Sequence, residues 1–261
     1  MIDESLNALD HRDEIAAHLQ RHLPVVFLDY DGTLTPIVAR PELAILDPEM
    51  RNTVARLSRG VTTAIISGRA CAEVRALVGI DGLYYAGNHG LEIEGPGGVA
   101  HCRFGEEYRE DVQCYAAEIG EVSGAIDGVL VENKDLSLSV HYRLAAPDRA
   151  AEIEAAVDRL LIRFPRLHKR RGKKVFEIRP GIDWHKGKAV MWLLQALHAE
   201  REVAIYIGDD ETDEDAFREL HGTGLGLLVG RTPATLADYW LADPGEVRDF
   251  LEVLVGLAGQ A

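Results

Sequence analysis

The sequence predicts a doubly wound α/β fold with a mostly parallel, Rossmann-like core sheet and a smaller inserted α+β domain. Short apolar runs alternate with helical patterns over residues 24–94, and the same alternation resumes at Lys186. Between these stretches the order changes to helix, hairpin, helix, hairpin. We therefore expect a core of residues 1–94 plus 176–261, interrupted by an inserted domain at 95–175.

Helix and strand signals follow one another along the first part of the core. Apolar residues at helical intervals predict a helix over residues 3–21. Asp47 as a cap, Pro48 in the first turn and Gly60 at the end delimit a second helix. Further elements are expected as a strand at 24–30, a strand at 61–67, a helix at 68–79 and a strand at 83–87.

The inserted domain begins after a turn at "EGPGG". A helix is expected at 106–122, and the turn signal Asn133-Lys134-Asp135 divides residues 128–143 into an antiparallel hairpin. A second helix at 147–164 and a second hairpin at 167–180 follow. The core then resumes with a helix at 186–200, a strand at 203–208, a helix, the strand "GLLVG" and closing helices.

Composition excludes several classes of function. The chain has 261 residues, 47% hydrophobic and 27% charged, with a formal charge of −15. Such an excess of acid argues against nucleic-acid or anionic-membrane partners. The N-terminal stretch has no apolar signal-peptide core, and Cys71, Cys102 and Cys114 form no C-x-x-C pair, so we expect a cytoplasmic protein with reduced thiols.

Polar residues follow four of the expected core strands. Ligands of open parallel sheets bind beyond the carboxyl ends of the strands. Each cluster alone has an ordinary explanation as a turn residue or a helix cap, but four coincidences at one sheet edge favour a site. The residues are Asp29 with Asp31, Ser67, Asn88 with His89, and Asp209 with Asp210.

This set suits a phosphate ester held with a hard cation. Asp29, Asp31 and Asp209 offer oxygen ligands for Mg²⁺, which also relieves the repulsion between carboxylates. Thr33 and Ser67 offer hydroxyls to a phosphate. The amides of the Asp31–Thr33 turn can form an anion nest, and Lys186 offers a positive charge.

The order of these motifs carries a family resemblance across essentially the whole chain. "DYDGTL", Ser67, Lys186 and "GDDETD" resemble the four motifs of the haloacid dehalogenase-like phosphohydrolases. More narrowly, the strings "SGR", "GNHGLE", "HYR", "FEIRPGIDWHKG" and "GDDETDEDAF" are similar to those of the trehalose-6-phosphate phosphatase family. The resemblance implies hydrolysis of trehalose 6-phosphate, Mg²⁺ as cofactor and an inserted cap that sets specificity.

The resemblance also implies roles for individual residues. Asp29 is the expected nucleophile, forming an aspartyl-phosphate, and Asp31 the general acid and base. Asp29 and Asp209 are expected to bind the metal through carboxylates, and Asp31 through its carbonyl. Lys186, with Thr33 and Ser67, is expected to bind phosphate; Asp210 and Asp213 are expected to orient metal-bound water or Lys186.

Sugar recognition is expected to come mainly from the inserted domain. Glu177 and Lys134 are the first candidates there, followed by His141 and Arg143. The core-side candidates are Arg69, Asn88, His89 and Glu92. Some family members carry a fused synthase domain, for which 261 residues leave no room, so any coupling is expected to be to a separate trehalose-6-phosphate synthase.

Several alternatives stay open at this point. A sucrose-phosphate phosphatase or a phosphohexomutase would use the same core chemistry. A receiver-type signalling module also uses an aspartyl-phosphate, but it lacks a second carboxylate like that of Asp31 and has no insertion of about eighty residues. A non-catalytic relative is disfavoured because all four motifs are filled. The basic run "KRRGKK" at 169–174 invites a nucleic-acid interpretation, but a solvated turn suits so acidic a chain better.

Overall fold

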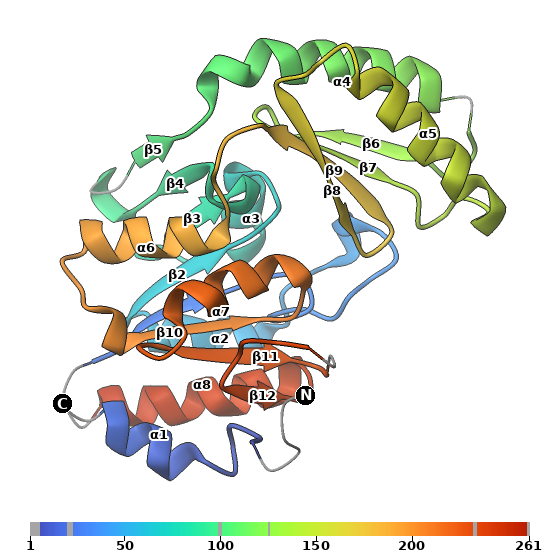
Figure 1. Ribbon diagram of the computed structural model, residues 1–261. Coiled ribbons are helices and arrows are strands. Elements are labelled where there is room, and N and C mark those ends of the chain that lie inside the picture. The colour runs from blue at the N-terminus through green and yellow to red at the C-terminus, as the bar shows by residue number, and fades with distance from the viewer. Residues whose placement is uncertain (1–5, 20–22, 99–100, 125, 232–233, 260–261) are drawn as a thin grey trace. The chain divides into compact units, whose positions relative to one another are not determined.

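The chain folds into two compact units. The computed structural model describes residues 6–19, 23–98, 101–124, 126–231 and 234–259. The core unit comprises Met1–Cys102 with Trp184–Ala261, and the inserted unit comprises Arg103–Asp183 (Figure 1). The boundaries expected from the sequence, residues 95 and 175, come earlier in the chain than these breaks.

The core unit is built on an eight-stranded sheet in the order β12-β11-β10-β1-β2-β3-β4-β5. The strands from β12 to β3 pair in parallel, and β4 is antiparallel to β3. The predicted fold class is therefore confirmed. The strands are β1 (Val25–Leu28), β2 (Thr62–Ile66), β3 (Tyr84–Gly87), β4 (Glu92–Glu94), β5 (His101–Arg103), β10 (Ala204–Gly208), β11 (Leu225–Val229) and β12 (Tyr239–Leu241).

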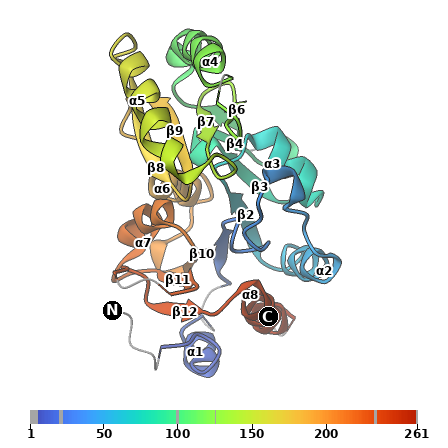
Figure 2. The same ribbon diagram turned by 90° about the vertical axis from the view of Figure 1, so that its right-hand side faces the viewer.

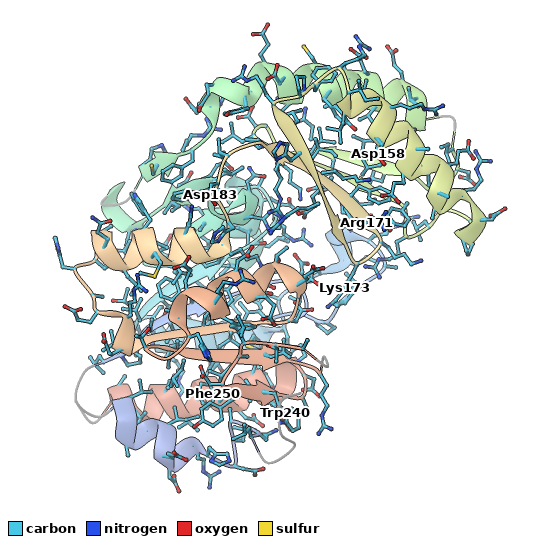
Figure 3. All side chains as sticks on the ribbon, in the orientation of Figure 1. Asp158, Arg171, Lys173, Asp183, Trp240 and Phe250 are labelled. Carbon is cyan, nitrogen blue, oxygen red and sulfur yellow. The ribbon has the colours of Figure 1, made fainter. Side chains whose placement is uncertain are left out.

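Helices cover both faces of this sheet. Helices α2 (Pro48–Leu57), α3 (Cys71–Val78) and α8 (Pro244–Ala258) lie on one face, and α6 (Lys186–Ala196) and α7 (Glu214–Leu220) on the other (Figure 2). Phe250 of α8 is fully buried in the cluster that joins the first set of helices to the sheet (Figure 3). Because both faces are covered, the central strands β1 and β10 are buried at every position and mostly apolar, as the sequence suggested.

Helix α2 begins with the N-terminal cap that the sequence predicted. The Asp47 side chain accepts hydrogen bonds from the amides of Glu49 and Met50 at 2.8 and 3.3 Å, and Pro48 occupies the first turn. These contacts satisfy two amides that have no partner within the helix. The predicted cap is therefore confirmed.

The expected helix over residues 3–21 is wrong in extent, because α1 spans only Arg12–Leu19. Residues 1–5 and 20–22 lie outside the described residues. The amide of Ala8 donates to Trp240 O at 2.9 Å, and the amide of Trp240 donates to Leu6 O at 3.1 Å. The backbone before α1 thus pairs with the edge strand β12, which replaces part of the expected closing helices.

The inserted unit has the predicted order of helix, hairpin, helix, hairpin. Its sheet runs β6-β7-β9-β8 and is antiparallel throughout. Apolar residues of the central strands, including Val140, Phe176 and Ile178, form one buried cluster with residues of the two helices. The elements are α4 (Arg109–Ser123), β6 (Leu130–Asn133), β7 (Leu138–His141), α5 (Ala150–Leu161), β8 (Leu167–Gly172) and β9 (Val175–Pro180).

Part of the basic run at 169–174 is paired within this unit. Lys169 forms ion pairs with Glu154 and Asp158 of α5, and Arg171 forms one with Glu154 (Figure 3). These pairs hold β8 against α5. Among the described residues of the whole chain, no helix is both long and apolar enough to cross a membrane.

Candidate active site

Four polar strand ends meet at one edge of the core sheet. Strands β10, β1, β2 and β3 are consecutive neighbours and parallel. Asp209 follows β10, Asp29 follows β1, Ser67 follows β2 and Asn88 follows β3. Parallel strands place their carboxyl ends at the same edge, so residues spread over 180 positions of sequence share one site.

A chain of buried hydrogen bonds runs through the centre of this edge. Lys186 Nζ donates to Asp29 Oδ1 and to Asp213 Oδ1, both at 2.7 Å. Tyr206, in β10, donates its hydroxyl hydrogen to the same Asp213 oxygen at 2.6 Å. All four side chains are buried. The ammonium of Lys186 therefore bridges two carboxylates out of reach of bulk water.

Burial and neighbouring charges strongly shift the pKa values of Asp29 and Lys186. Burial raises the pKa of the Asp29 carboxyl well above its ordinary value; Lys186 opposes this shift, and the charges of Asp213 and Asp209 add to it. Burial alone would lower the pKa of Lys186, but Asp213 and Asp29 outweigh it and leave that pKa raised. The site thus keeps Lys186 positive while placing several acids close together, a charge distribution that a cation would balance.

Three carboxylates lie close enough to share a cation. Asp29, Asp209 and Asp213 each offer an oxygen, and these oxygens lie within 4.8 Å of one another. Asp213, however, already accepts four hydrogen bonds. Its Oδ2 accepts hydrogen bonds from the amides of Asp209 and Asp210 at 3.0 and 2.9 Å. Its Oδ1 accepts from Lys186 Nζ and from the Tyr206 hydroxyl. With about four acceptor positions on a carboxylate all used, Asp29 and Asp209 are the better ligands.

The turn after β1 requires glycine. Gly32 has φ of +96°, and a Cβ there would lie 2.3 Å from Asp209 Cγ. The absence of a side chain lets the Asp31–Thr33 backbone approach Asp209 directly. The Gly32 amide donates to Thr35 O at 2.8 Å and so is engaged within the turn; the anion nest stays a prediction for the turn.

Asp31 and Arg69 form a bidentate ion pair. Arg69 Nε and Nη2 donate to the two Asp31 carboxylate oxygens, each at 2.7 Å. Arg69 also binds Glu73 of α3 and the carbonyl of Pro41. The arginine is 6% exposed and the Asp31 side chain 41% exposed. Arg69, which the sequence suggested as a sugar ligand, here orients the carboxylate of Asp31.

Two hydroxyls lie at this edge as expected. The Ser67 side chain accepts a hydrogen bond from the Arg69 amide at 3.1 Å, so its own hydrogen can still be donated. Thr33 is fully buried, and its Oγ1 has no hydrogen-bond partner among the described residues. A buried hydroxyl of this kind is costly unless a bound group satisfies it.

The turn after β3 supports the Ser67 loop. Asn88 and His89 have φ of +51° and +57°, which is rare for residues with side chains. The His89 amide donates to Ser67 O at 2.8 Å. Glu92 accepts from the Asn88 side chain at 2.8 Å and from the Cys71 amide at 3.3 Å. Asn88 and Glu92 thus join the turn to the start of α3.

Asp210 lies at a helical start. It caps the short turn Glu211–Asp213, and its side chain and that of Asp213 satisfy each other's backbone amides. This reciprocal arrangement fixes the loop after β10. Asp213, by contrast, contacts Lys186 directly, as the resemblance implied.

The predicted sugar residues of the inserted unit lie on or beside its sheet. Glu132 contacts His141 Nε2 at 2.9 Å and Lys134 Nζ at 3.7 Å. Glu177 pairs with Arg179 on β9. In register, Glu132, Ser139, Glu177 and Arg170 face one another across the four strands, on the face opposite the apolar cluster.

Arg143 lies apart from this polar row. Its guanidinium donates to the Lys173 carbonyl at 2.8 Å and thereby ties the end of β7 to the β8–β9 turn. The structure thus brings Lys134 and His141 together through Glu132, places Glu177 in the row beside them, and gives Arg143 a backbone contact.

The chain has the fold of the haloacid dehalogenase-like hydrolases. A hydrolase of that type from Bacteroides thetaiotaomicron shares the fold, with a TM-score of 0.65 over 88% of this chain and 99% of that one at 17% identity. Residues 27–244 match the trehalose-phosphatase family. The chain therefore belongs to the trehalose-phosphatase family of phosphoric monoester hydrolases.

Individual relatives agree with this membership. Probable trehalose-phosphate phosphatase 9 of Oryza sativa is 44% identical over 280 residues, covering 97% of this chain and 75% of the rice protein. Trehalose-phosphate phosphatase B of Arabidopsis thaliana is 41% identical, covering 95% and 71%. The C-terminal domain of Candida albicans trehalose-6-phosphate phosphatase has a TM-score of 0.80 at 26% identity, covering 96% and 98%.

Sequence reasoning missed several residues of this arrangement. Tyr206 reads as one more apolar strand residue, and only its hydroxyl contact reveals it. Glu73 and Arg179 read as ordinary charges on a helix and a strand. Glu132 had a usable signal, because it lies two residues from Lys134, a spacing that in an extended chain places two side chains on the same side.

Proposed function

We propose that this protein hydrolyses trehalose 6-phosphate to trehalose and phosphate, with Mg²⁺ as cofactor and an aspartyl-phosphate as intermediate. The observation that carries the proposal is the buried contact of Asp29 with Lys186 beside Asp209, in a chain of the trehalose-phosphatase family. The names of the relatives support the choice of substrate.

The carboxylates fit the proposed cation. Asp29 and Asp209 would hold Mg²⁺ through carboxylate oxygens, and Asp31 through its carbonyl, leaving positions for water as Mg²⁺ prefers. The close approach of Gly32 to Asp209 supports this grouping. When bound, the ion neutralises charge on the acids and on the phosphate.

In the first proposed step, an Asp29 carboxylate oxygen forms a bond to phosphorus and the bond from phosphorus to the sugar oxygen breaks. Asp31 enters this step protonated on one carboxyl oxygen, and that oxygen gives up its hydrogen bond from Arg69. The proton passes from Asp31 to the sugar oxygen as the bond to phosphorus breaks. Lys186, Ser67 and Thr33 donate to the phosphoryl oxygens. In the second step water attacks phosphorus, Asp31 takes its proton, and Asp29 leaves.

Specificity is proposed to reside in residues 103–183, and coupling to a separate synthase remains a prediction. A disaccharide offers hydroxyls to side chains that donate and accept, such as Glu177, Lys134 and His141. Arg143 is a weaker candidate because its guanidinium already binds the Lys173 carbonyl. On the core side, Arg69, Asn88, His89 and Glu92 are proposed to shape the site through the contacts described above.

The test is phosphate release by the purified protein, with Mg²⁺ and then with EDTA, from four sugar phosphates: trehalose 6-phosphate, sucrose 6-phosphate, glucose 6-phosphate and glucose 1-phosphate. We expect strong preference for trehalose 6-phosphate and loss of release with EDTA. Preference for another sugar phosphate would refute the substrate and keep the chemistry. No release from any would refute the hydrolase assignment.

A further inference from the structure

We propose that Tyr206 is a positioning residue that holds Asp213, and through it Lys186, in the geometry needed for phosphoryl transfer. This inference rests on the proposed function. Tyr206 lies in β10, three residues before Asp209. Its hydroxyl donates a hydrogen bond to Asp213 Oδ1, so Asp213 is the route by which Tyr206 can hold Lys186 in place.

The hydroxyl of Tyr206 is committed to one partner. The side chain is fully buried, and its ring meets Phe217 of α7 edge-on, with centroids 5.7 Å apart. A buried phenol needs a hydrogen-bond partner, and Asp213 Oδ1 provides it at 2.6 Å. The contact is as short as those expected between a hydroxyl and a charged carboxylate.

Asp213 receives donors from three separate parts of the core unit. Tyr206 approaches from β10, Lys186 from the start of α6, and the amides of Asp209 and Asp210 from the loop after β10. The two amides fix Oδ2. The tyrosine and the lysine share Oδ1, and of these two the tyrosine has the more rigid side chain.

Removing the Tyr206 hydroxyl therefore loosens Asp213 and, through it, Lys186. With phenylalanine at position 206, Asp213 Oδ1 keeps only the ammonium of Lys186, which stands at the end of a longer and more flexible side chain. The carboxylate can then rotate away from its present plane, and Lys186 can follow it away from Asp29, which it now contacts at 2.7 Å. Charge stabilisation in the transition state depends on donors held in place beforehand.

The test compares Tyr206→Phe with Tyr85→Phe. Tyr85 of β3 is also buried, 3% exposed, and its hydroxyl donates to Ile80 O at 2.7 Å, away from the strand ends. Both variants lose one phenolic hydrogen bond. We expect Tyr206→Phe to lower kcat for phosphate release about tenfold, with KM within about twofold of wild type, and Tyr85→Phe to leave both constants at wild-type values.

A second readout does not depend on activity. Hydrogen–deuterium exchange of the amides of Asp209 and Asp210 reports how firmly Asp213 is held. We expect faster exchange in Tyr206→Phe and wild-type exchange in Tyr85→Phe. Equal kcat values in the two variants, or a rise in KM in place of a fall in kcat, would overturn the catalytic role. Unchanged exchange in Tyr206→Phe would overturn the positioning itself.

The two readouts also separate this inference from the proposed function. If the wild-type protein releases no phosphate from any sugar phosphate, the proposed function fails. The exchange comparison then still decides whether Tyr206 fixes Asp213. If the wild-type protein is active and the two phenylalanine variants behave alike, only the role of Tyr206 fails.

Discussion

Replacement of Gly32 by alanine separates the geometry of the site from the stability of the fold. Gly32 has φ of +96°, and an added Cβ would lie 2.3 Å from Asp209 Cγ. Ordinary contact begins at 3.4 Å, so the Asp209 carboxylate and the turn must separate by about 1 Å. Asp209 is the residue that would share a cation with Asp29.

Two effects of different size follow. The positive φ costs about 1–3 kcal/mol of stability once a Cβ is present. A displacement of about 1 Å in a catalytic group lowers the rate by about 100-fold. We therefore expect Gly32→Ala to remain folded at room temperature, because domains are stable by about 5–15 kcal/mol, while losing about 99% of its kcat/KM.

Gly82→Ala is the matched control. Gly82 has φ of +87°, and a Cβ there would meet nothing within 4 Å. It carries the same backbone strain without the contact to Asp209. Urea unfolding and phosphate release are measured for both variants. We expect stability losses from strain in both, and loss of activity in Gly32→Ala alone. Activity of Gly32→Ala within about threefold of Gly82→Ala would refute the reasoning.

Three further predictions follow from the ion pairs and the polar sheet face. Asp213→Ala leaves the buried Tyr206 hydroxyl and the amides of Asp209 and Asp210 without their acceptor, while Lys186 keeps Asp29 as a partner. It should destabilise the core unit by about 3 kcal/mol in urea unfolding; a loss below about 1 kcal/mol would contradict this account of the contacts. Partial burial alone would raise the pKa of the Asp135 carboxyl, but hydrogen bonds from Arg103 and Arg109 outweigh it and lower that pKa below the ordinary 3.8. The ionised carboxylate therefore stabilises the folded state at pH values above 3.8. Asp135→Asn should therefore lose about 1 kcal/mol equally at pH 7 and pH 5, and the difference should shrink as the pH falls below 3.8; a constant difference would exclude this linkage. Glu177→Ala should reduce kcat/KM for trehalose 6-phosphate far more than for a small aryl phosphate, and equal losses would remove Glu177 from sugar recognition.

Much of the fold was predictable because burial on both faces leaves a plain sequence signal. Strand β1 and helix α2 show it best, the first as an uninterrupted apolar run and the second through the Asp47 cap. Strands β4, β5 and β12 were not predicted. Each spans three residues, too few to show a period. The residues before α1 have helical spacing, but pairing with β12 overrides it.

The site was predictable where its residues carry charge at strand ends, and not where function depends on a partner distant in sequence. Asp29 and Asp209 follow apolar runs, so their position at the sheet edge could be foreseen. The pairing of Arg69 with Asp31 spans 38 positions, and no local pattern encodes it. Tyr206 is buried like a core residue, and its hydroxyl contacts Asp213 of the site. The sequence indicates the burial but not the contact.

The central claim is that Asp29, held by Lys186, attacks the phosphate ester. The most direct measurement is phosphate release from trehalose 6-phosphate with Mg²⁺ by Asp29→Asn beside wild type, with thermal unfolding to confirm that both are folded. We predict release by wild type and none above background by the variant, because an amide oxygen is a poor nucleophile. Release at the wild-type rate by folded Asp29→Asn would contradict the account.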